Sequence, residues 1–170
     1  MEGVFMFKKL FGKKEAVKAI EVKAALTGTA VNLEEVPDPV FAERMMGDGI
    51  AIEPAEGVVV SPVNGEVVQV FPTKHAIGIR AENGAEILIH IGLETVSMKG
   101  EGFETHISEG SNVSEGDKLV TFDLALVKEK AKSTVTPIII TNGDQVASLE
   151  KNAAGAVTRG TSTVMTVTAK

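Results

Sequence analysis

The sequence predicts an all-β protein, an antiparallel sandwich or barrel with one or two short helices. The 22 Val, 12 Ile and 14 Thr residues are β-branched and favour strands. They occur in short runs separated by turn-forming dipeptides, and 17 glycines supply further turns. Strands that follow one another with turns about every ten residues are typical of antiparallel β folds.

Composition excludes several classes of protein. The chain has no Cys, which excludes disulfide scaffolds, zinc–thiolate sites, iron–sulfur clusters and thiol nucleophiles. A net charge of −6 argues against nucleic acid as a partner. No run approaches the roughly 20 apolar residues of a membrane helix, and lysines interrupt the one stretch that resembles a secretory signal. We therefore expect a cytoplasmic protein.

The first 18 residues form a leader distinct from the domain at 19–170. Residues 1–14 carry four Lys and one Glu, whereas the remaining 156 residues have a net charge of −9. Residues 4–14 interleave Phe and Leu with Lys, a pattern typical of a short amphipathic helix on an anionic membrane surface. A solubilising leader without fixed structure explains the same pattern, and both readings stay open.

Two hairpins are predicted in the first half of the domain. Residues 57–60 and 66–71 flank Asn64-Gly65, and residues 76–80 and 86–91 flank Asn83-Gly84. Asn-Gly between β-branched runs favours a tight hairpin turn. Further strands are expected at residues 119–122, 136–141 and 163–168.

Two short helices are predicted, each with an aspartate N-cap. Residues 39–46 follow Asp38, with Pro39 in the first turn and Gly47 at the end. Residues 123–132 begin at Asp123 and carry lysines in the last turn, where they complement the helix dipole.

Histidines are the residues best suited to chemistry. The chain has three, His75, His90 and His106. His90 ends an apolar strand, where alternation places it on one face with Glu86 and Leu88 and the intervening isoleucines on the other. His106 reads as a surface residue.

The second hairpin brings His75 close to His90. Symmetry about its turn sets His90 opposite Ala76, one step from His75, and a twist or bulge at Gly78 or Gly84 would turn the two rings toward each other. On the residues alone, the pair fits a structural or weak metal site as well as a catalytic one.

The flanking residues favour a catalytic pair. The Thr73 hydroxyl is placed to fix the tautomer of His75, and the Gly92 carbonyl to accept a hydrogen bond from Nδ1–H of His90. The unprotonated Nε2 of His90 is then a nucleophile.

Residues 84–96, GAEILIHIGLETV, resemble the active-site signature of the glucose-type enzyme IIA domains. These are phosphocarriers of the bacterial phosphoenolpyruvate-dependent sugar phosphotransferase system. The resemblance extends from Glu21 to the C-terminus. It includes residues 37–43, 47–52, 61–65, 99–103, 122–124 and 129–134. It implies a duplicated, hybrid-motif β architecture.

The resemblance also implies a mechanism. The histidine at the position of His90 takes a phosphoryl group from the phosphohistidine of the carrier HPr and passes it to a cysteine on a IIB domain. His75 matches a second histidine that hydrogen-bonds to the phosphoryl oxygens, and Thr73 and Gly92 match positions that orient the two rings. No cofactor is required, and the acceptor cysteine must lie on another chain because this one has none.

The resemblance further points to a docking surface around the histidines, with Asp38 and Glu94 on its rim. The acidic domain is expected to attract a carrier with a basic surface. We expect the chain to be a monomer whose interfaces with its partners are transient. Two residues depart from the family pattern: Glu94 stands where the family has Asp, and Pro39 where it has an apolar residue. The expected apolar ring consists of Val40, Phe41, Met45, Met46, Phe71, Leu88 and Val96.

A zinc peptidase and a regulatory protein are the two alternative functions. A zinc peptidase of related architecture is rejected because Ile79 and Gly92 stand where it would need ligands. A weak regulatory zinc site made of His75, His90 and a partner's carboxylate stays open. So does a regulatory protein whose phosphorylation at His90 controls permeases or kinases. The sequence does not specify the sugar.

Overall fold

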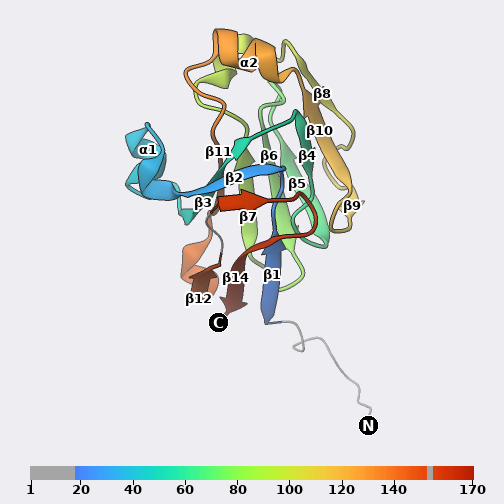
Figure 1. Cartoon of the computed structure of the whole chain (residues 1–170). Coiled ribbons are helices and arrows are strands. Elements are labelled where there is room, and N and C mark those ends of the chain that lie inside the picture. The colour runs from blue at the N-terminus through green and yellow to red at the C-terminus, as the bar shows by residue number, and fades with distance from the viewer. Residues whose placement is uncertain (1–17, 153–154) are drawn as a thin grey trace.

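The computed structural model describes residues 18–152 and 155–170 as antiparallel sheets with short helices, which confirms the predicted all-β class (Figure 1). The predicted leader, apart from Lys18, lies outside the described residues. No helix within the described ranges has the length and apolar character needed to cross a membrane.

The largest sheet has eight strands; His90 ends its strand β7 (Glu86–His90), and His75 lies immediately before its strand β6 (Ala76–Ala81). Its β7 and β11 lie near the middle, between β3 and β6. In spatial order its strands are β13 (Gly155–Val157), β2 (Gly28–Asn32), β3 (Asp48–Pro54), β11 (Thr136–Ile140), β7 (Glu86–His90), β6 (Ala76–Ala81), β5 (Gly65–Val70) and β9 (Asn112–Val113).

Two three-stranded sheets complete the domain. One consists of β1 (Ala19–Lys23), β14 (Thr163–Ala169) and β12 (Val146–Lys151). The other consists of β4 (Val58–Val60), β10 (Lys118–Phe122) and β8 (Phe103–Thr105). All three sheets are antiparallel throughout the described pairs.

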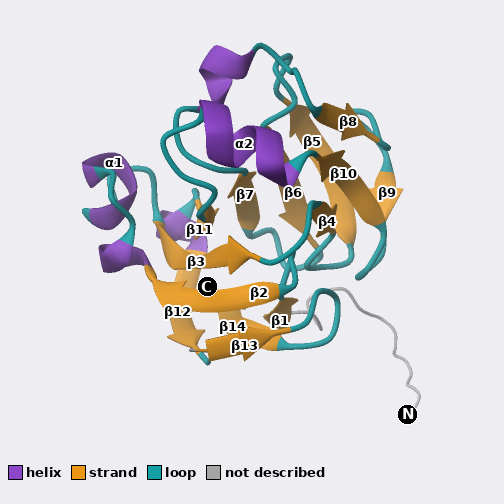
Figure 2. Cartoon of the chain, turned by 45° about the horizontal axis from the view of Figure 1, so that its top comes forward, coloured by secondary structure: helices purple, strands orange, loops and turns teal. Residues whose placement is uncertain are grey.

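Within the described residues, five short helical segments connect the strands. Figure 2 shows α1 (Pro39–Ala42) at the side of the molecule beside the ends of β2 and β3, and Figure 1 shows α2 (Leu124–Lys130) at the top of the view. Three 3-10 helices are η2 (Leu33–Glu35), η3 (Thr95–Met98) and η4 (Gly143–Gln145). The last two follow β7 and β11 directly along the chain.

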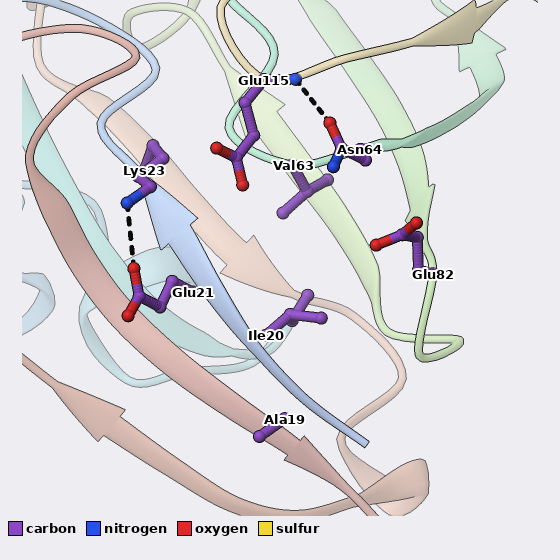
Figure 3. Close-up of a pocket in the computed structure, with 8 residues that line it drawn as sticks. All are labelled: Ala19, Ile20, Glu21, Lys23, Val63, Asn64, Glu82 and Glu115. Atoms are coloured by element: carbon purple, nitrogen blue, oxygen red, sulfur yellow. Dashed lines mark hydrogen bonds and ion pairs between the residues drawn. The ribbon is translucent and has the colours of Figure 1, made fainter. Parts of the chain in front are cut away.

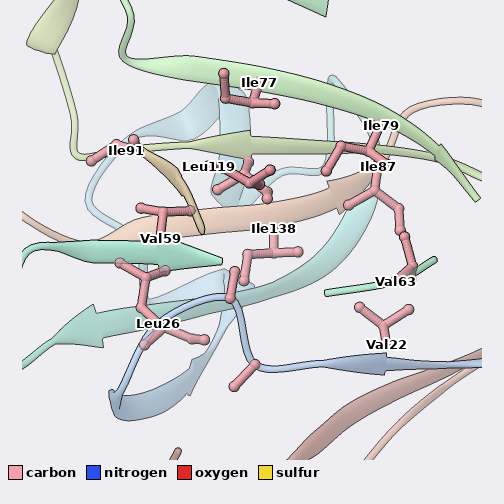
Figure 4. Packing of buried hydrophobic residues seen from close by; sticks show 14 of the residues in the cluster. Val22, Leu26, Val59, Val63, Ile77, Ile79, Ile87, Ile91, Leu119 and Ile138 are labelled. Carbon is pink, nitrogen blue, oxygen red and sulfur yellow. The ribbon is translucent and has the colours of Figure 1, made fainter. Parts of the chain in front are cut away.

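The main core lies between the sheets, and isoleucines of β6, β7 and β11 point into it (Figure 4). A second, smaller cluster covers the opposite face of the large sheet. It contains Leu33, Val36, Phe41, Ala51, Ala76, Leu88, Leu93, Val135 and Ile139. The middle of the sheet is therefore buried on both faces. Strand β7, which ends at His90, has little freedom to move.

The prediction of a hairpin at Asn64-Gly65 is wrong. Strand β4 pairs with β10, whereas β5 pairs with β6 and β9, so the segment between them crosses from one sheet to another. Val63 is buried in this crossover, and the Asn64 side chain accepts a hydrogen bond from the backbone N–H of Glu115. Burial of the connection and pairing with distant strands override the local turn signal.

Both predicted helices are present but shorter than expected. Asp38 and Asp123 cap them as predicted, accepting hydrogen bonds from the N–H groups of Val40 and Leu126. The first helix ends at Ala42 rather than Met46, because Arg44 adopts a left-handed conformation with φ of 58°. The other predicted strands are observed, with ends shifted by a residue or two.

The hairpin of β6 and β7 is anchored at its turn by two asparagine side chains. Asn83 donates hydrogen bonds to the carbonyls of Lys18 (2.8 Å) and Val167 (3.1 Å) and accepts one from Ala85 N–H. Asn142 accepts from the N–H of Glu86 and donates to the Gly84 carbonyl. Strands β1, β11 and β14 thereby fix the end of the hairpin that lies away from the histidines.

We predict that Asn83→Ala lowers the free energy of unfolding by about 1–3 kcal/mol, because it removes the two hydrogen bonds to the Lys18 and Val167 carbonyls and the one from Ala85 N–H. Asn64→Ala, which removes one exposed hydrogen bond from another Asn-Gly sequence, is the matched control and should cost less than about 1 kcal/mol. Urea unfolding measures both. Equal losses would contradict a special anchoring role for Asn83.

Candidate functional site

His75 and His90 meet edge to face at the open end of the β6–β7 hairpin. Their ring centroids are 4.9 Å apart and the ring planes are inclined by 80°. The predicted register is confirmed, since Ala76 pairs with His90 and the His75 carbonyl accepts from Ile91 N–H at 2.7 Å.

The two rings meet without a bulge between β6 and β7, whose register is unbroken. His75 precedes the first residue of β6, so strand alternation does not set its direction. It follows a tight turn in which Lys74 has a φ of 66° and its N–H donates to the Phe71 carbonyl. This turn, rather than a bulge at Gly78 or Gly84, directs the imidazole toward His90.

Each imidazole is held through Nδ1. Nδ1 of His75 lies 2.7 Å from the Thr73 hydroxyl, and Nδ1 of His90 lies 2.8 Å from the Gly92 carbonyl. A carbonyl can only accept, so the hydrogen-bond pattern assigns the proton of His90 to Nδ1. Nε2 of His90 is therefore unprotonated in the neutral ring and carries a free lone pair. Both expected hydrogen bonds are present.

Two phenylalanines extend the histidine pair into a row of four rings. Phe41 packs against His90 with a centroid distance of 5.0 Å, and Phe71 packs against His75 at 5.5 Å. Phe41 is buried and Phe71 half-buried. The row restricts both imidazoles and surrounds them with apolar surface.

Burial shifts the titration of both histidines toward the neutral form. Desolvation and, to a lesser extent, the nearby His90 together lower the pKa of His75 to about 4, because burial disfavours the charged ring and two positive rings repel each other. Desolvation also lowers the pKa of His90. The Gly92 carbonyl and the Asp38 carboxylate oppose that shift. Both imidazoles are therefore neutral near pH 7.

Gly92 is required at its position by backbone geometry. It has a φ of 73°, and a Cβ atom there would lie 2.7 Å from Cγ2 of Thr95 and 2.9 Å from the Ser133 carbonyl oxygen. A side chain would displace the carbonyl that binds His90. The tight space also identifies Thr95 and Ser133 as supports of the site.

The apolar ring expected around the histidines is only partly at the surface. Val40, Met45, Met46 and Val96 are 36%, 69%, 41% and 56% exposed. Phe41 and Leu88 are buried, so the structure places them beneath the site rather than in its surface ring. Asp38 is half-buried beside α1 and Glu94 is exposed with a φ of 60°.

The described residues offer no complete metal site. Within residues 18–152 and 155–170, no three His, Cys, Asp or Glu side chains gather closely enough to hold an ion. His75 and His90 would present two Nε2 atoms, and a third ligand would have to come from another molecule. His106 is exposed, 3.0 Å from the Thr121 hydroxyl, and takes no part in the site.

A separate pocket lies near the turn of the β6–β7 hairpin, away from the histidines (Figure 3). It contains an ion pair between Lys23 and Glu21 at 2.9 Å. Its lining residues are Ala19, Ile20, Glu21, Lys23, Val63, Asn64, Glu82 and Glu115. None of them is a histidine, and its one lysine is held in an ion pair with Glu21, so the candidate site is the histidine pair.

Sequence reasoning missed Thr95 and Thr136. Both are fully buried beside Gly92, and their hydroxyls bond to the backbone there. In the sequence, Thr136 reads as an ordinary strand residue and Thr95 as one position of a longer motif. A glycine directly after an apolar strand and three residues before Thr95 is the only sequence feature that relates to Thr95, and Thr136 has no such feature.

Fold and site together define a class of protein, an all-β domain that presents two adjacent neutral histidines, one of them with a free Nε2 lone pair. A family model described as phosphoenolpyruvate-dependent sugar phosphotransferase system, EIIA 1, matches residues 20–146. A solved structure of glucose permease IIA from Mycoplasma capricolum superposes with a TM-score of 0.83 at 46% identity, covering 88% of this chain and 96% of that chain.

Curated relatives match over nearly the whole chain. The glucose-specific EIIA component of Bacillus cereus is 63% identical over 97% of this chain and 100% of its own length. That of Halalkalibacterium halodurans is 59% identical over 95% and 98%. The Staphylococcus aureus protein is 56% identical over 96% and 99%. The chain belongs to the EIIA 1 family of the sugar phosphotransferase system, a family of phosphotransfer components, and the resemblance of residues 84–96 is confirmed.

We predict that Gly92→Ala lowers the free energy of unfolding by about 2–5 kcal/mol, the sum of left-handed strain and steric overlap. Gly84→Ala is the matched control, since Gly84 has a φ of 90° and no atoms within 4 Å of an added Cβ. It should cost about 1–2 kcal/mol. Denaturant unfolding compares them, and similar losses would show that the contacts around Gly92 tolerate a methyl group.

We also predict that acid destabilises the protein through His75. The unfolded chain binds a proton near the ordinary pKa of 6.5, whereas folded His75 resists protonation down to about 4. Stability is therefore full above pH 6.5 and falls as the pH drops toward 4, with His75 contributing a loss of about 2 kcal/mol between pH 7 and pH 5.

Urea unfolding at both pH values measures this loss. His75→Gln should lose about 2 kcal/mol less than the wild type over the same interval. His106→Gln, which removes an exposed imidazole outside the site, is the control. An unchanged pH dependence in His75→Gln would contradict the assignment.

Proposed function

We propose that the protein is a cytoplasmic phosphocarrier in which His90 accepts a phosphoryl group from the phosphohistidine of HPr and donates it to a cysteine of a IIB domain. The observation that carries this proposal is the hydrogen bond from Nδ1 of His90 to the Gly92 carbonyl. It leaves Nε2 as the nucleophilic nitrogen at the edge of the site.

The proposed transfer needs no proton movement on His90. The Nε2 lone pair forms the new N–P bond while the bond between phosphorus and the donor imidazole breaks, and the donor keeps its electron pair. The ring of His90 becomes positively charged with its proton still on Nδ1, and the Gly92 carbonyl stabilises that charge. In the second step a thiolate attacks phosphorus, the N–P bond breaks, and neutral His90 is restored.

His75 is proposed to stabilise the phosphoryl group as it arrives. If the Thr73 hydroxyl donates to Nδ1, the proton of His75 lies on Nε2 and points a donor at the phosphoryl oxygens. That Nε2 then has no free lone pair and does not compete with His90 for the phosphoryl group, and the low pKa of His75 keeps the ring neutral. Donors placed before the reaction begins stabilise developing negative charge without reorganisation.

The surface around His90 suits transient docking. Val40, Met45, Met46 and Val96 expose apolar area beside the acidic side chains of Asp38 and Glu94. An apolar centre with a charged rim is typical of protein interfaces, and negative charge favours encounter with a basic carrier. The same surface would serve HPr and the IIB domain in turn, since both must reach Nε2 of His90.

The relatives' names extend the proposal to glucose. The Bacillus cereus, Halalkalibacterium halodurans and Staphylococcus aureus proteins are named glucose-specific EIIA components. We infer that the IIB partner belongs to a glucose permease. Membranes containing glucose permease, with a permease for another sugar as control, would test this by the sugar phosphate formed.

We predict that the wild type gains one acid-labile phosphoryl group on incubation with phosphoenolpyruvate, enzyme I and HPr. His90→Gln should gain none because it lacks the nucleophile. His75→Gln should accept the group yet transfer it to the IIB domain at least about 100-fold more slowly, a loss typical of one missing transition-state donor. Intact mass and sugar phosphate formation measure the two steps.

Each outcome distinguishes the carrier from the alternatives. A wild type that stays unmodified would contradict the carrier proposal and favour zinc held by His75, His90 and a partner's carboxylate. Phosphorylation without onward transfer to any IIB domain would instead favour a regulatory protein that reports its phosphorylation state by binding.

A further inference from the structure

The backbone around Gly92 is held at four points. The peptide between Ile91 and Gly92 is bonded through its carbonyl to the Thr95 hydroxyl at 2.6 Å and through its N–H to the Thr136 hydroxyl at 3.4 Å. The next peptide is bonded through the Gly92 carbonyl to His90 and through Leu93 N–H to the Ser133 carbonyl at 2.9 Å. Both peptide planes beside Gly92 therefore have partners at both ends.

These partners compensate for the freedom of glycine. Gly92 has a φ of 73°, and a glycine in this region can rotate its neighbouring peptides at little steric cost. A rotation that turned the Gly92 carbonyl away would leave Nδ1–H of His90 without an acceptor. The ring would then be free to carry its proton on Nε2, the nitrogen that must attack phosphorus.

Thr95 makes the shortest of the four contacts, and the chain is bent to place it there. Its side chain is fully buried, and its methyl group lies 2.7 Å from where a Cβ on Gly92 would be. Glu94 and Lys99, at the two ends of η3, both adopt left-handed conformations that are uncommon for residues other than glycine. The turn at Glu94 brings the Thr95 hydroxyl back to the Ile91 carbonyl.

We propose that Thr95 is a positioning residue for phosphoryl transfer: its hydroxyl fixes the peptide before Gly92, and thereby keeps the Gly92 carbonyl on Nδ1–H and Nε2 of His90 unprotonated. The kinetic part of this inference rests on the proposed function, whereas the tautomer of His90 does not. Thr136 supports the same peptide from the other side through a longer hydrogen bond.

Three variants test the proposal. Thr95→Val removes the hydroxyl and keeps the shape, whereas Thr95→Ser keeps the hydroxyl and removes the methyl group. Ser61→Ala is the matched control, because Ser61 is also fully buried and donates to a backbone carbonyl, that of Val63 at 2.7 Å, in the crossover between β4 and β5. Thr95→Ala replaces Thr95→Val if the valine variant does not fold.

The first readout is the tautomer of His90 from ¹⁵N chemical shifts of the unphosphorylated protein. The wild type, Thr95→Ser and Ser61→Ala should show the Nδ1–H form, and Thr95→Val a mixture of both forms. The second readout is transfer from phospho-HPr, for which Thr95→Val should lower kcat about tenfold with KM unchanged. Thr95→Ser should stay within about twofold of the wild type.

A Thr95→Val variant with a pure Nδ1–H tautomer and wild-type kcat would overturn the proposal and reduce Thr95 to a structural hydroxyl like Ser61. Failure of the wild type to accept phosphate would overturn the proposed function. That result would leave the tautomer measurement to decide the positioning role by itself.

Discussion

The hydrogen bond between Nδ1 of His90 and the Gly92 carbonyl is the interaction on which the site depends. It joins two residues of one short segment, yet neither is placed by that segment alone. His90 is fixed by the pairing of β6 with β7, and Gly92 by hydroxyl and carbonyl groups near β11 and η3. Because the large sheet is buried on both faces, these elements hold their relative positions. The rigid sheet therefore fixes the orientation of the His90 imidazole.

The class of the fold followed from composition and turn chemistry, and so did the hairpin that carries the histidines. Its register was predictable because β-branched runs of matching length flank a short turn. The crossover at Asn64-Gly65 was not, because the partners of β4 and β5 are strands distant in sequence. Local turn preference carries no information about such partners. The shortened α1 has a related cause, since Arg44 is bound by Glu34 at 2.6 Å and Asp48 at 2.9 Å, contacts that periodicity does not reveal.

In the candidate site, too, residues that are close in sequence were predictable and those that depend on distant contacts were not. Thr73, His75, His90 and Gly92 are close in sequence or joined by one hairpin, so spacing alone brought them together. Burial was harder to predict. Phe41 suited both a surface ring and a core, and only the second apolar cluster on the large sheet shows that it packs beneath His90. Thr95 and Thr136 were hidden because a threonine that supports a backbone peptide looks like any strand or turn residue.

Two residues of the same type acquire different properties here because their surroundings differ. His75 is buried between Phe71 and His90, and desolvation holds its pKa near 4. His90 is half-buried, and the Gly92 carbonyl and the Asp38 carboxylate counteract its desolvation. A ring that resists charging suits a neutral hydrogen-bond donor. A ring with an acceptor for its proton and an anion nearby suits the positive charge that the proposed phosphorylation would create. The environment thus gives the two rings different properties, which match the proposed roles of hydrogen-bond donor for His75 and nucleophile for His90.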